Sequence, residues 1–554
     1  MTTLFNEEGY MLLERIEVSG FRGIKRLSLS FEQLTTLIGE NTWGKSSLLD
    51  ALSIALPISG ELHQFSLTDF HQDHSISYTQ DQHIQIIITF QTTEKNEYRA
   101  GRYRKLASLW QPDENSHAQR IYYRISATNN DGKITASHSF LDNKGRILRY
   151  HKIHMLVYEL IRLHPVIRIR DARRLHPDGD TAPLPDDRIE RRINNTCRRL
   201  LTSPGQVSSG EIKSALHSMQ ALVEHYFAFK NHNRHTQHRI HDDLFFGQKT
   251  EGISLTQFIN QNKSKQTKLL LLGLLNTYLR AKGPNVLKPS ARPLMIVEDP
   301  EGRLHPTQLI QAWTLLNHIP MQKILTTNSS ELLSTVPLCS IRRLVRESDS
   351  TSCYSVSPTC LSKDDLRRIT FHVRFQRSNA LFARCWLLVE GETEVWLFNE
   401  MARILGYNLA AEGIQIIEFA QSGLKSLIKI AKTLHIEWHV VTDGDPAGKK
   451  YAFAVKSQLD NEHQRHRLTE LPHKDIEHYL YHHGFEPLFR ELSNTSVDQP
   501  VPPKKIIIKT LKKYAKPDLA LAIVQYCEDN GPESIPLLLR WTLKRTLTMA
   551  KGQG

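Results

Sequence analysis

A loop near the N-terminus has the residue types that hold nucleotide phosphates. Residues 39–46 read Gly-Glu-Asn-Thr-Trp-Gly-Lys-Ser, which fits the pattern G-x-x-x-x-G-K-[ST]. In such a loop the backbone N–H groups surround phosphate oxygens, Lys45 supplies charge to the β- and γ-phosphates, and the Ser46 hydroxyl ligates Mg²⁺. We expect the nucleotide contacts to come from Gly39, Asn41, Gly44, Lys45, Ser46 and Ser47.

A second sequence could complete this phosphate site. The apolar residues 293–297 predict a buried strand, and Glu298 and Asp299 follow it directly. A P-loop needs a carboxylate at the end of a neighbouring strand, so Glu298 is expected to hold Mg²⁺ through water and Asp299 to polarise the attacking water. Together with the P-loop, this pattern predicts a complete nucleotide-hydrolysis site.

Two further pairs of acids lie at predicted strand ends in the last third of the chain. Glu390 and Glu394 follow the apolar strand 386–389, and Asp443 and Asp445 follow the strand 436–441. Parallel strands bring their carboxyl ends to one edge of a sheet, so up to four carboxylates would meet there. Such crowding is unfavourable without a cation, and oxygen ligands suit Mg²⁺ or Mn²⁺. The sequence therefore predicts a second metal site.

Strands and helices that could position these residues alternate along the chain. We expect strands at 12–18, 27–31, 34–38, 84–90, 98–104, 120–126, 293–297 and 323–325, and helices at 47–55, 266–280 and 306–316. The early strands are typical of an antiparallel lobe beside a parallel sheet. The fold class is therefore predicted to be α/β, with two successive α/β units.

Six segments follow from these patterns. They are an N-terminal extension at 1–10, a nucleotide-binding part with the P-loop at 11–150, a helical insertion at 151–245 that would contact nucleic acid or form a dimer surface, a second nucleotide-binding part at 246–375, a metal-binding α/β domain at 380–500, and a basic helical segment at 501–554.

Composition and charge restrict the class of protein. The net charge is +13, which favours a polyanionic partner. Residues 381–500 carry 12 basic and 17 acidic side chains, whereas residues 501–554 carry 10 and 4. Six scattered cysteines without a CxxC pair argue against a disulfide framework and a cysteine zinc site. Without a membrane-spanning segment or a secretory signal, we expect a cytoplasmic protein and no membrane partner.

The N-terminal motifs resemble those of an ABC/SMC/RecF-like P-loop ATPase head. The resemblance is carried by Phe21-Arg22, the P-loop, the Glu-Asp-Pro-Glu run at 298–301 and the Leu-His-Pro run at 304–306. It implies ATP as the nucleotide. Asn328 stands where these proteins have a histidine that senses the γ-phosphate, and Ser264 is the best match to a degenerate signature sequence. Because asparagine can hydrogen-bond phosphate but cannot act as an acid, we expect slow hydrolysis.

The C-terminal motifs resemble a TOPRIM domain, with strand-Glu-Gly-x-x-Glu followed by strand-Asp-x-Asp. An ABC-type ATPase followed by TOPRIM is the arrangement of the overcoming-lysogenization-defect (OLD) family of ATP-dependent endonucleases. This resemblance implies a homodimer and two-metal cleavage of DNA. It implies that Glu390, Glu394, Asp443 and Asp445 hold one ion, that Glu477 holds the other, and that Lys516 offsets charge on the scissile phosphate.

Other functions are compatible with parts of these motifs. A topoisomerase would need a nucleophilic tyrosine on a separate domain, and a primase would need a zinc module, for which no cysteine set exists. The stronger alternative is a non-catalytic, ATP-gated DNA-binding clamp or recombination mediator of the RecF/SMC type. The sequence leaves open the preferred DNA, the biological trigger in repair or phage defence, and an additional protein partner.

Overall fold

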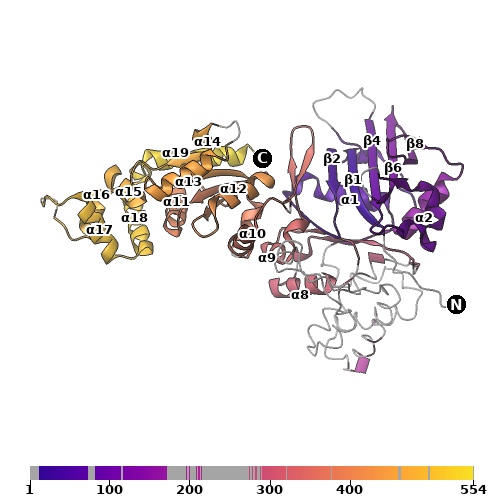
Figure 1. The fold of residues 1–554 in the computed structure, drawn as a ribbon, viewed down its shortest axis with the longest axis horizontal. Coiled ribbons are helices and arrows are strands. Elements are labelled where there is room, and N and C mark those ends of the chain that lie inside the picture. The colour runs from indigo at the N-terminus through magenta and orange to yellow at the C-terminus, as the bar shows by residue number, and fades with distance from the viewer. Residues whose placement is uncertain are drawn as a thin grey trace. The chain divides into compact units, whose positions relative to one another are not determined.

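The computed structural model describes residues 11–72, 82–113, 117–170, isolated positions between 195 and 288, and 290–552 with gaps at 303, 318, 320, 358, 376, 460–462 and 497–498. The chain forms two compact units, Met1–Tyr354 and Ser355–Gly554, each built around its own sheet (Figure 1). The α/β class expected from the sequence is confirmed. Among the described residues, no helix combines the length and apolar composition that a membrane crossing needs.

The first unit contains a thirteen-stranded mixed sheet. Its antiparallel part consists of β1 (Leu12–Phe21), β2 (Ile24–Ser30), β4 (Gln82–Gln91), β5 (Gln111–Pro112), β6 (Gln119–Asn130), β7 (Lys133–Leu141) and β8 (Ile147–Leu148). Its parallel part consists of β12 (Ile341–Arg346), β3 (Leu34–Ile38), β11 (Lys323–Thr326), β10 (Leu294–Glu298) and β9 (Val166–Arg170). The hairpin strand β13 (Thr351–Tyr354) joins the two parts. The expected antiparallel lobe beside a parallel sheet is thus confirmed.

The pattern of buried side chains differs between the antiparallel and the parallel part of the sheet. In β4, Ile84, Ile86, Ile88 and Phe90 alternate as buried residues, as expected where only one face is fully covered. All residues of β10 and β11 are buried, as in a parallel sheet covered on both faces. The helices of this unit are α1 (Lys45–Ala55), α2 (Ile153–Leu163), α8 (Pro306–Asn317) and α9 (Ser330–Thr335), with short helical turns η1 (Asn41–Trp43), η2 (Leu67–Asp69), η7 (Pro300–Gly302) and η8 (Leu338–Ser340).

Two expectations about this unit need correction. The predicted strand 98–104 is instead the helical pair η3 (Glu97–Arg99) and η4 (Gly101–Leu109), in which Tyr103, Leu106 and Leu109 are buried at the three-residue period of a 3-10 helix. Residues 151–170 are not part of an insertion, because β9 pairs with β10 in the main sheet. The compact units divide at Tyr354, ahead of the expected boundary near 380, and α10 (Lys363–Ile369) contacts α12 (Leu424–Thr433) of the second unit.

The second unit is a four-stranded parallel sheet in the order β15-β14-β16-β17. The strands are β14 (Cys385–Val389), β15 (Ile414–Glu418), β16 (Glu437–Thr442) and β17 (Leu468–Glu470). Because the crossover direction reverses after β15, right-handed connections put α11 (Glu392–Ile404) and α12 (Leu424–Thr433) on opposite faces. Helix α19 (Leu537–Lys551) also covers the sheet, because it packs on β14 and β16 beside α11.

Several later helices share one apolar core with α11, namely α15 (Ile476–Leu480), η11 (Tyr481–Phe485), α16 (Glu486–Leu492), α17 (Pro503–Lys513) and α18 (Lys516–Asn530). The unit also contains α13 (Pro446–Lys456), α14 (Gln464–Arg467), η9 (Thr370–Phe375), η10 (Ser378–Phe382) and η12 (Pro532–Ser534). The contact of α18 with α11 brings the start of the C-terminal segment to the helix that follows β14.

Candidate functional site

The P-loop connects β3 to α1, as its sequence requires. Gly44 has φ +90°, a conformation that favours glycine, and it leads directly into the first turn of α1. The Lys45 ammonium donates to the Gly39 carbonyl over 2.7 Å and to Asn328 Oδ1 over 3.0 Å. Ser46 is exposed at the same turn. The structure therefore places Lys45 and Asn328 together although 283 residues separate them.

Glu298 is the last residue of β10 and Asp299 follows it, and each already has a partner. Asp299 has φ +41°, unusual for a residue with a side chain. It is held there by Thr326: the Asp299 amide donates to the Thr326 carbonyl over 3.1 Å, and the Thr326 hydroxyl donates to Asp299 Oδ1 over 2.8 Å. The carboxylate of Glu298 accepts from Arg168 Nε over 2.9 Å.

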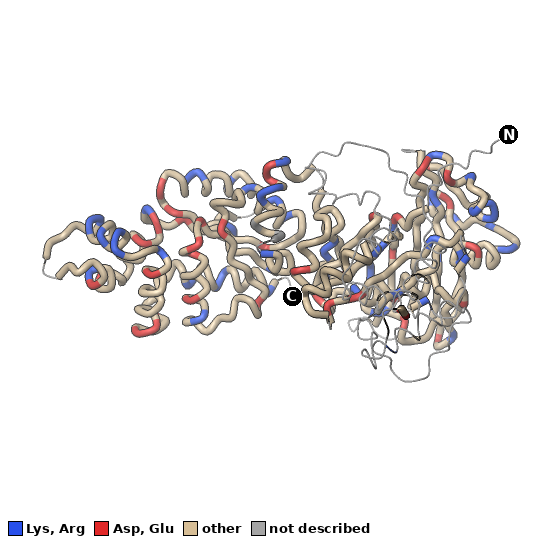
Figure 2. Tube along the Cα trace, turned by 90° about the horizontal axis from the view of Figure 1, so that it is seen from below, with Lys and Arg blue, Asp and Glu red and all other residues tan. Residues whose placement is uncertain are grey.

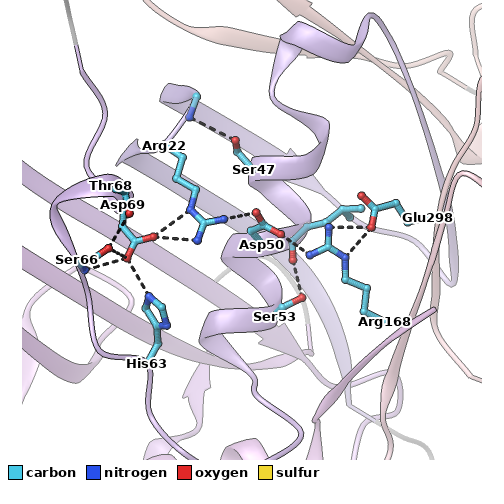
Figure 3. Close-up of polar contacts among 12 residues, drawn as sticks. Arg22, Ser47, Asp50, Ser53, His63, Ser66, Thr68, Asp69, Arg168 and Glu298 are labelled. Carbon is cyan, nitrogen blue, oxygen red and sulfur yellow. Dashed lines mark hydrogen bonds and ion pairs between the residues drawn. The ribbon is translucent and has the colours of Figure 1, made fainter. Parts of the chain in front are cut away.

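A chain of alternating charges extends from Glu298 across the P-loop helix (Figure 3). Arg168 on β9 bridges Glu298 and Asp50 of α1, and Arg22 in the β1–β2 turn bridges Asp50 and Asp69. Because the five groups alternate in sign and are buried or half-buried, the network joins four separate segments to α1.

Ser47 belongs to the same region but faces the turn. Its hydroxyl accepts from the Gly23 amide over 3.3 Å (Figure 3). The expected nucleotide contact from Ser47 would require this bond to open.

Electrostatics around the P-loop lysine fit an anion site. Burial lowers the pKa of Lys45, and the nearby carboxylates of Asp299 and Glu301 oppose that shift. Burial raises the pKa of Glu301, which accepts from the Asn328 amide over 2.6 Å. Lys45 is thus a buried cation, and a phosphate close to it would be strongly attracted.

The second site is built at the carboxyl ends of β14 and β16. Glu390 follows β14, and Glu394 lies in the first turn of α11, where its Oε2 accepts from the Gly391 amide over 3.0 Å. Asp443 and Asp445 follow β16, and Asp445 Oδ1 accepts from the Gly448 amide over 2.6 Å at the start of α13. These helix-start bonds orient the carboxylates at one sheet edge.

Two later segments reach the same edge. Glu477 is buried in α15, next to Asp475, the residue that caps that helix. Lys516 begins α18, and its charge opposes the rise in pKa that burial causes at both Glu390 and Glu477. We call Glu390, Glu394, Asp443, Asp445, Asp475 and Glu477 the acidic cluster.

Mutual repulsion within the acidic cluster is strong. Burial and the charges of Glu394, Glu390, Asp475 and Glu477 raise the pKa of Asp443 to about 8. Burial and the charges of Asp445 and Glu394 likewise raise the pKa of Glu390. Like charges held this close disfavour one another's ionisation, so the cluster favours a proton or a cation between its members.

The donor set of the acidic cluster fits a hard divalent cation. Glu390 Oε2 is buried and has no hydrogen-bond partner among the described residues. No three Asp, Glu, His or Cys side chains in the described ranges already have the spacing of a formed metal site. A cation would therefore draw the carboxylates inward, and Glu390 Oε2 is free to turn toward it.

Sequence reasoning missed several members of these sites. Asp475 stands two residues before Glu477, and this Asp-x-Glu spacing at a helix start was a readable signal. Asp50 and Arg168 had no such signal, because only the fold brings α1 and β9 together. A further unpredicted feature is the stack of His473 on His482, with ring centroids 4.7 Å apart, beside the acidic cluster. The predicted Ser264 signature lies outside the described residues.

Comparisons with known proteins identify the family of this chain. Residues 11–380 match the family described as "Protein of unknown function (DUF2813)". The chain belongs to this family. Residues 381–445 match the "Overcoming lysogenization defect protein-like, TOPRIM domain" family, which confirms the resemblance read from the C-terminal motifs. The uncharacterized protein YbjD of Escherichia coli (strain K12) is 43% identical over 98% of this chain and 100% of its own length.

Solved structures show weaker likenesses. The C-terminal region of the Burkholderia pseudomallei OLD protein is 18% identical, covers 31% of this chain and 98% of its own, and has a TM-score of 0.26. The SMC head domain from Thermotoga maritima is 12% identical, covers 62% of this chain and 99% of its own, and has a TM-score of 0.29. The family assignment therefore depends on the sequence matches.

Proposed function

We propose that this protein is an ATP-gated, divalent-metal-dependent DNA endonuclease that acts in DNA repair or phage defence. The observation that carries the proposal is the acidic cluster: six carboxylates and Lys516, drawn from four separate segments, meet at one edge of a TOPRIM sheet. A structural role does not account for acids that raise one another's pKa. Metal-dependent phosphodiester cleavage does.

The residues divide into three roles. Glu390, Glu394, Asp443 and Asp445 would hold one Mg²⁺ or Mn²⁺, and Glu477 would hold a second. When bound, such ions lower the pKa of a water nucleophile and neutralise charge on the leaving oxygen. Lys516 would contact the scissile phosphate and offset its developing charge. Glu477 is buried and Asp443 is half-buried, so these charges would be screened less than on an open surface.

The nucleotide-binding unit would control access to this chemistry. Lys45 would exchange its bonds to Gly39 and Asn328 for ATP phosphates, while Ser46 and Glu298 would hold Mg²⁺. Asp299 would orient water. Because Glu298 is held by Arg168 and Asn328 replaces an acid, hydrolysis should be slow. A homodimer through this unit would make ATP binding a gate.

A plasmid assay tests the proposal. Purified protein is incubated with supercoiled and linear DNA in Mg²⁺ or Mn²⁺, with and without ATP, beside Glu394→Ala and Asp443→Ala. We expect nicking or linearisation by the parent only. A matched control is Glu400→Ala, another acid of α11 outside the acidic cluster, which should cut normally. A parent that shifts DNA in an ATP-dependent manner but never cuts it would establish the clamp instead.

A further inference from the structure

Helix α17 presents a basic face that the reaction itself does not use. Its sequence is Pro-Lys-Lys-Ile-Ile-Ile-Lys-Thr-Leu-Lys-Lys, without an acid. Ile506, Ile507 and Thr510 are buried, whereas Lys504, Lys505, Lys509 and Lys512 are exposed. We call these four residues the lysine face; blue segments gather along α17 in Figure 2, at the far left.

The lysine face is unpaired within the described part of the chain. None of its four ammonium groups makes an ion pair or hydrogen bond there, whereas the fifth lysine, Lys513, donates to the Leu492 carbonyl over 2.9 Å and to Asn494 Oδ1 over 3.1 Å. Lys513 thus anchors the helix. The other four concentrate positive charge that calls for an external polyanion.

Packing fixes the lysine face relative to the acidic cluster. α17 contacts α15, the helix that carries Glu477, and also α16. The Thr510 hydroxyl donates to the Phe489 carbonyl of α16 over 3.3 Å. The chain then passes from Lys513 to Lys516, at the cluster, in three residues. A polyanion lying on α17 is therefore led toward the acids.

We infer that the lysine face of α17 binds the sugar-phosphate backbone of duplex DNA beside the cleavage centre. This inference extends the proposed endonuclease function. From Lys504 to Lys512 the helix rises about 12 Å, the length over which one strand of B-DNA presents roughly three or four phosphates. Four exposed ammonium groups match that number. The net charge of −5 on residues 381–500 repels DNA, and the lysine face would offset this repulsion.

A matched pair of double variants tests this. Lys505→Gln/Lys509→Gln removes two lysines spaced i, i+4 from α17, and Lys425→Gln/Lys429→Gln removes two exposed lysines of the same spacing from α12, which lies on the sheet face opposite α11. Binding of the full-length protein to a fluorescent DNA duplex is measured by anisotropy in EDTA across a NaCl series. Circular dichroism and thermal midpoints verify folding.

We expect the α17 pair to weaken binding by about 10- to 60-fold and to reduce the slope of log K against log[salt] by about 2, because each lost phosphate contact removes about 0.9 from that slope. The α12 pair should match the parent. Equal slopes for both pairs would overturn the inference, as would tighter binding of RNA with the same lysine dependence.

Because EDTA prevents metal-dependent cutting, the two proposals fail separately. An inactive parent whose binding still needs α17 would refute the endonuclease and support the lysine face. An active enzyme whose α17 pair binds as the parent does would refute the lysine face alone.

Discussion

The two acidic centres of this protein differ in how their charges are balanced. Beside the P-loop, Glu298 is neutralised by Arg168 and Asp299 is held by Thr326, so the chain supplies partners from within. In the acidic cluster, carboxylates face carboxylates, the pKa of Asp443 is raised to about 8, and Glu390 Oε2 has no hydrogen-bond partner among the described residues. The charges of the first centre are balanced within the chain, whereas the second favours a proton or, as we propose, a cation.

The largest effect should come from removing a member of the acidic cluster. Asp443→Ala is expected to reduce DNA cleavage by about 10²-fold or more, since it deletes a ligand at the reacting centre. ATP binding, measured with a fluorescent analogue, should be unchanged. Cleavage within a few-fold of the parent would show that the cluster does not hold the catalytic metal.

The P-loop lysine gives the corresponding test in the first unit. Lys45→Met should weaken ATP binding by about 10- to 100-fold, because a hydrogen bond to a charged group contributes about 1.5–3 kcal/mol. Equilibrium dialysis with labelled ATP provides the measurement. Binding of a divalent metal ion at the acidic cluster should be unchanged in this variant. Its loss would argue that the two centres are not independent.

Removing Arg168 should expose the internal balance of the first centre. Arg168→Gln leaves Glu298 and Asp50 short of a partner, so the free energy of unfolding is expected to fall by about 1–3 kcal/mol. Arg15→Gln, which removes an exposed pair with Glu17, should cost about 0–1 kcal/mol. Urea unfolding compares them, and equal losses would mean that the buried network adds nothing.

The smallest effect concerns pH and the metal-free second unit. Between about pH 4 and 8 the folded protein keeps a proton on Asp443 that the unfolded chain has lost, so this residue makes stability fall as the pH rises through that window. In EDTA, Asp443→Asn should therefore raise the thermal midpoint at pH 8 by about 2–4 °C and have little effect at pH 4. A variant less stable than the parent at pH 8 would contradict this sign.

Much of both centres was readable from local sequence because strand-loop-helix patterns carry their own geometry. β3, the P-loop and α1 appear where the glycines and apolar residues indicate, and Glu390 and Asp443 follow their predicted strands. The α/β class and the TOPRIM domain were predicted for the same reason.

What local patterns could not show was long-range pairing. β9 and β10 are distant in the sequence and pair only in the folded sheet, so the predicted insertion at 151–245 begins too early. For the same reason, the ion pair between Arg168 and Asp50 could not be predicted. The strand predicted at 98–104 is wrong because tyrosines such as Tyr98 and Tyr103 suit both structures, whereas burial at every third residue marks this segment as a 3-10 helix.

Direct observation of Mn²⁺ tests the contrast between the two centres most simply. Electron paramagnetic resonance would follow Mn²⁺ binding without ATP or DNA in the parent, Asp443→Ala and Glu298→Ala. Our account predicts that the parent and Glu298→Ala bind the ion and that Asp443→Ala loses it, since Lys516 alone cannot balance the six carboxylates of the acidic cluster. Equal Mn²⁺ binding by all three proteins, or none by the parent, would contradict it.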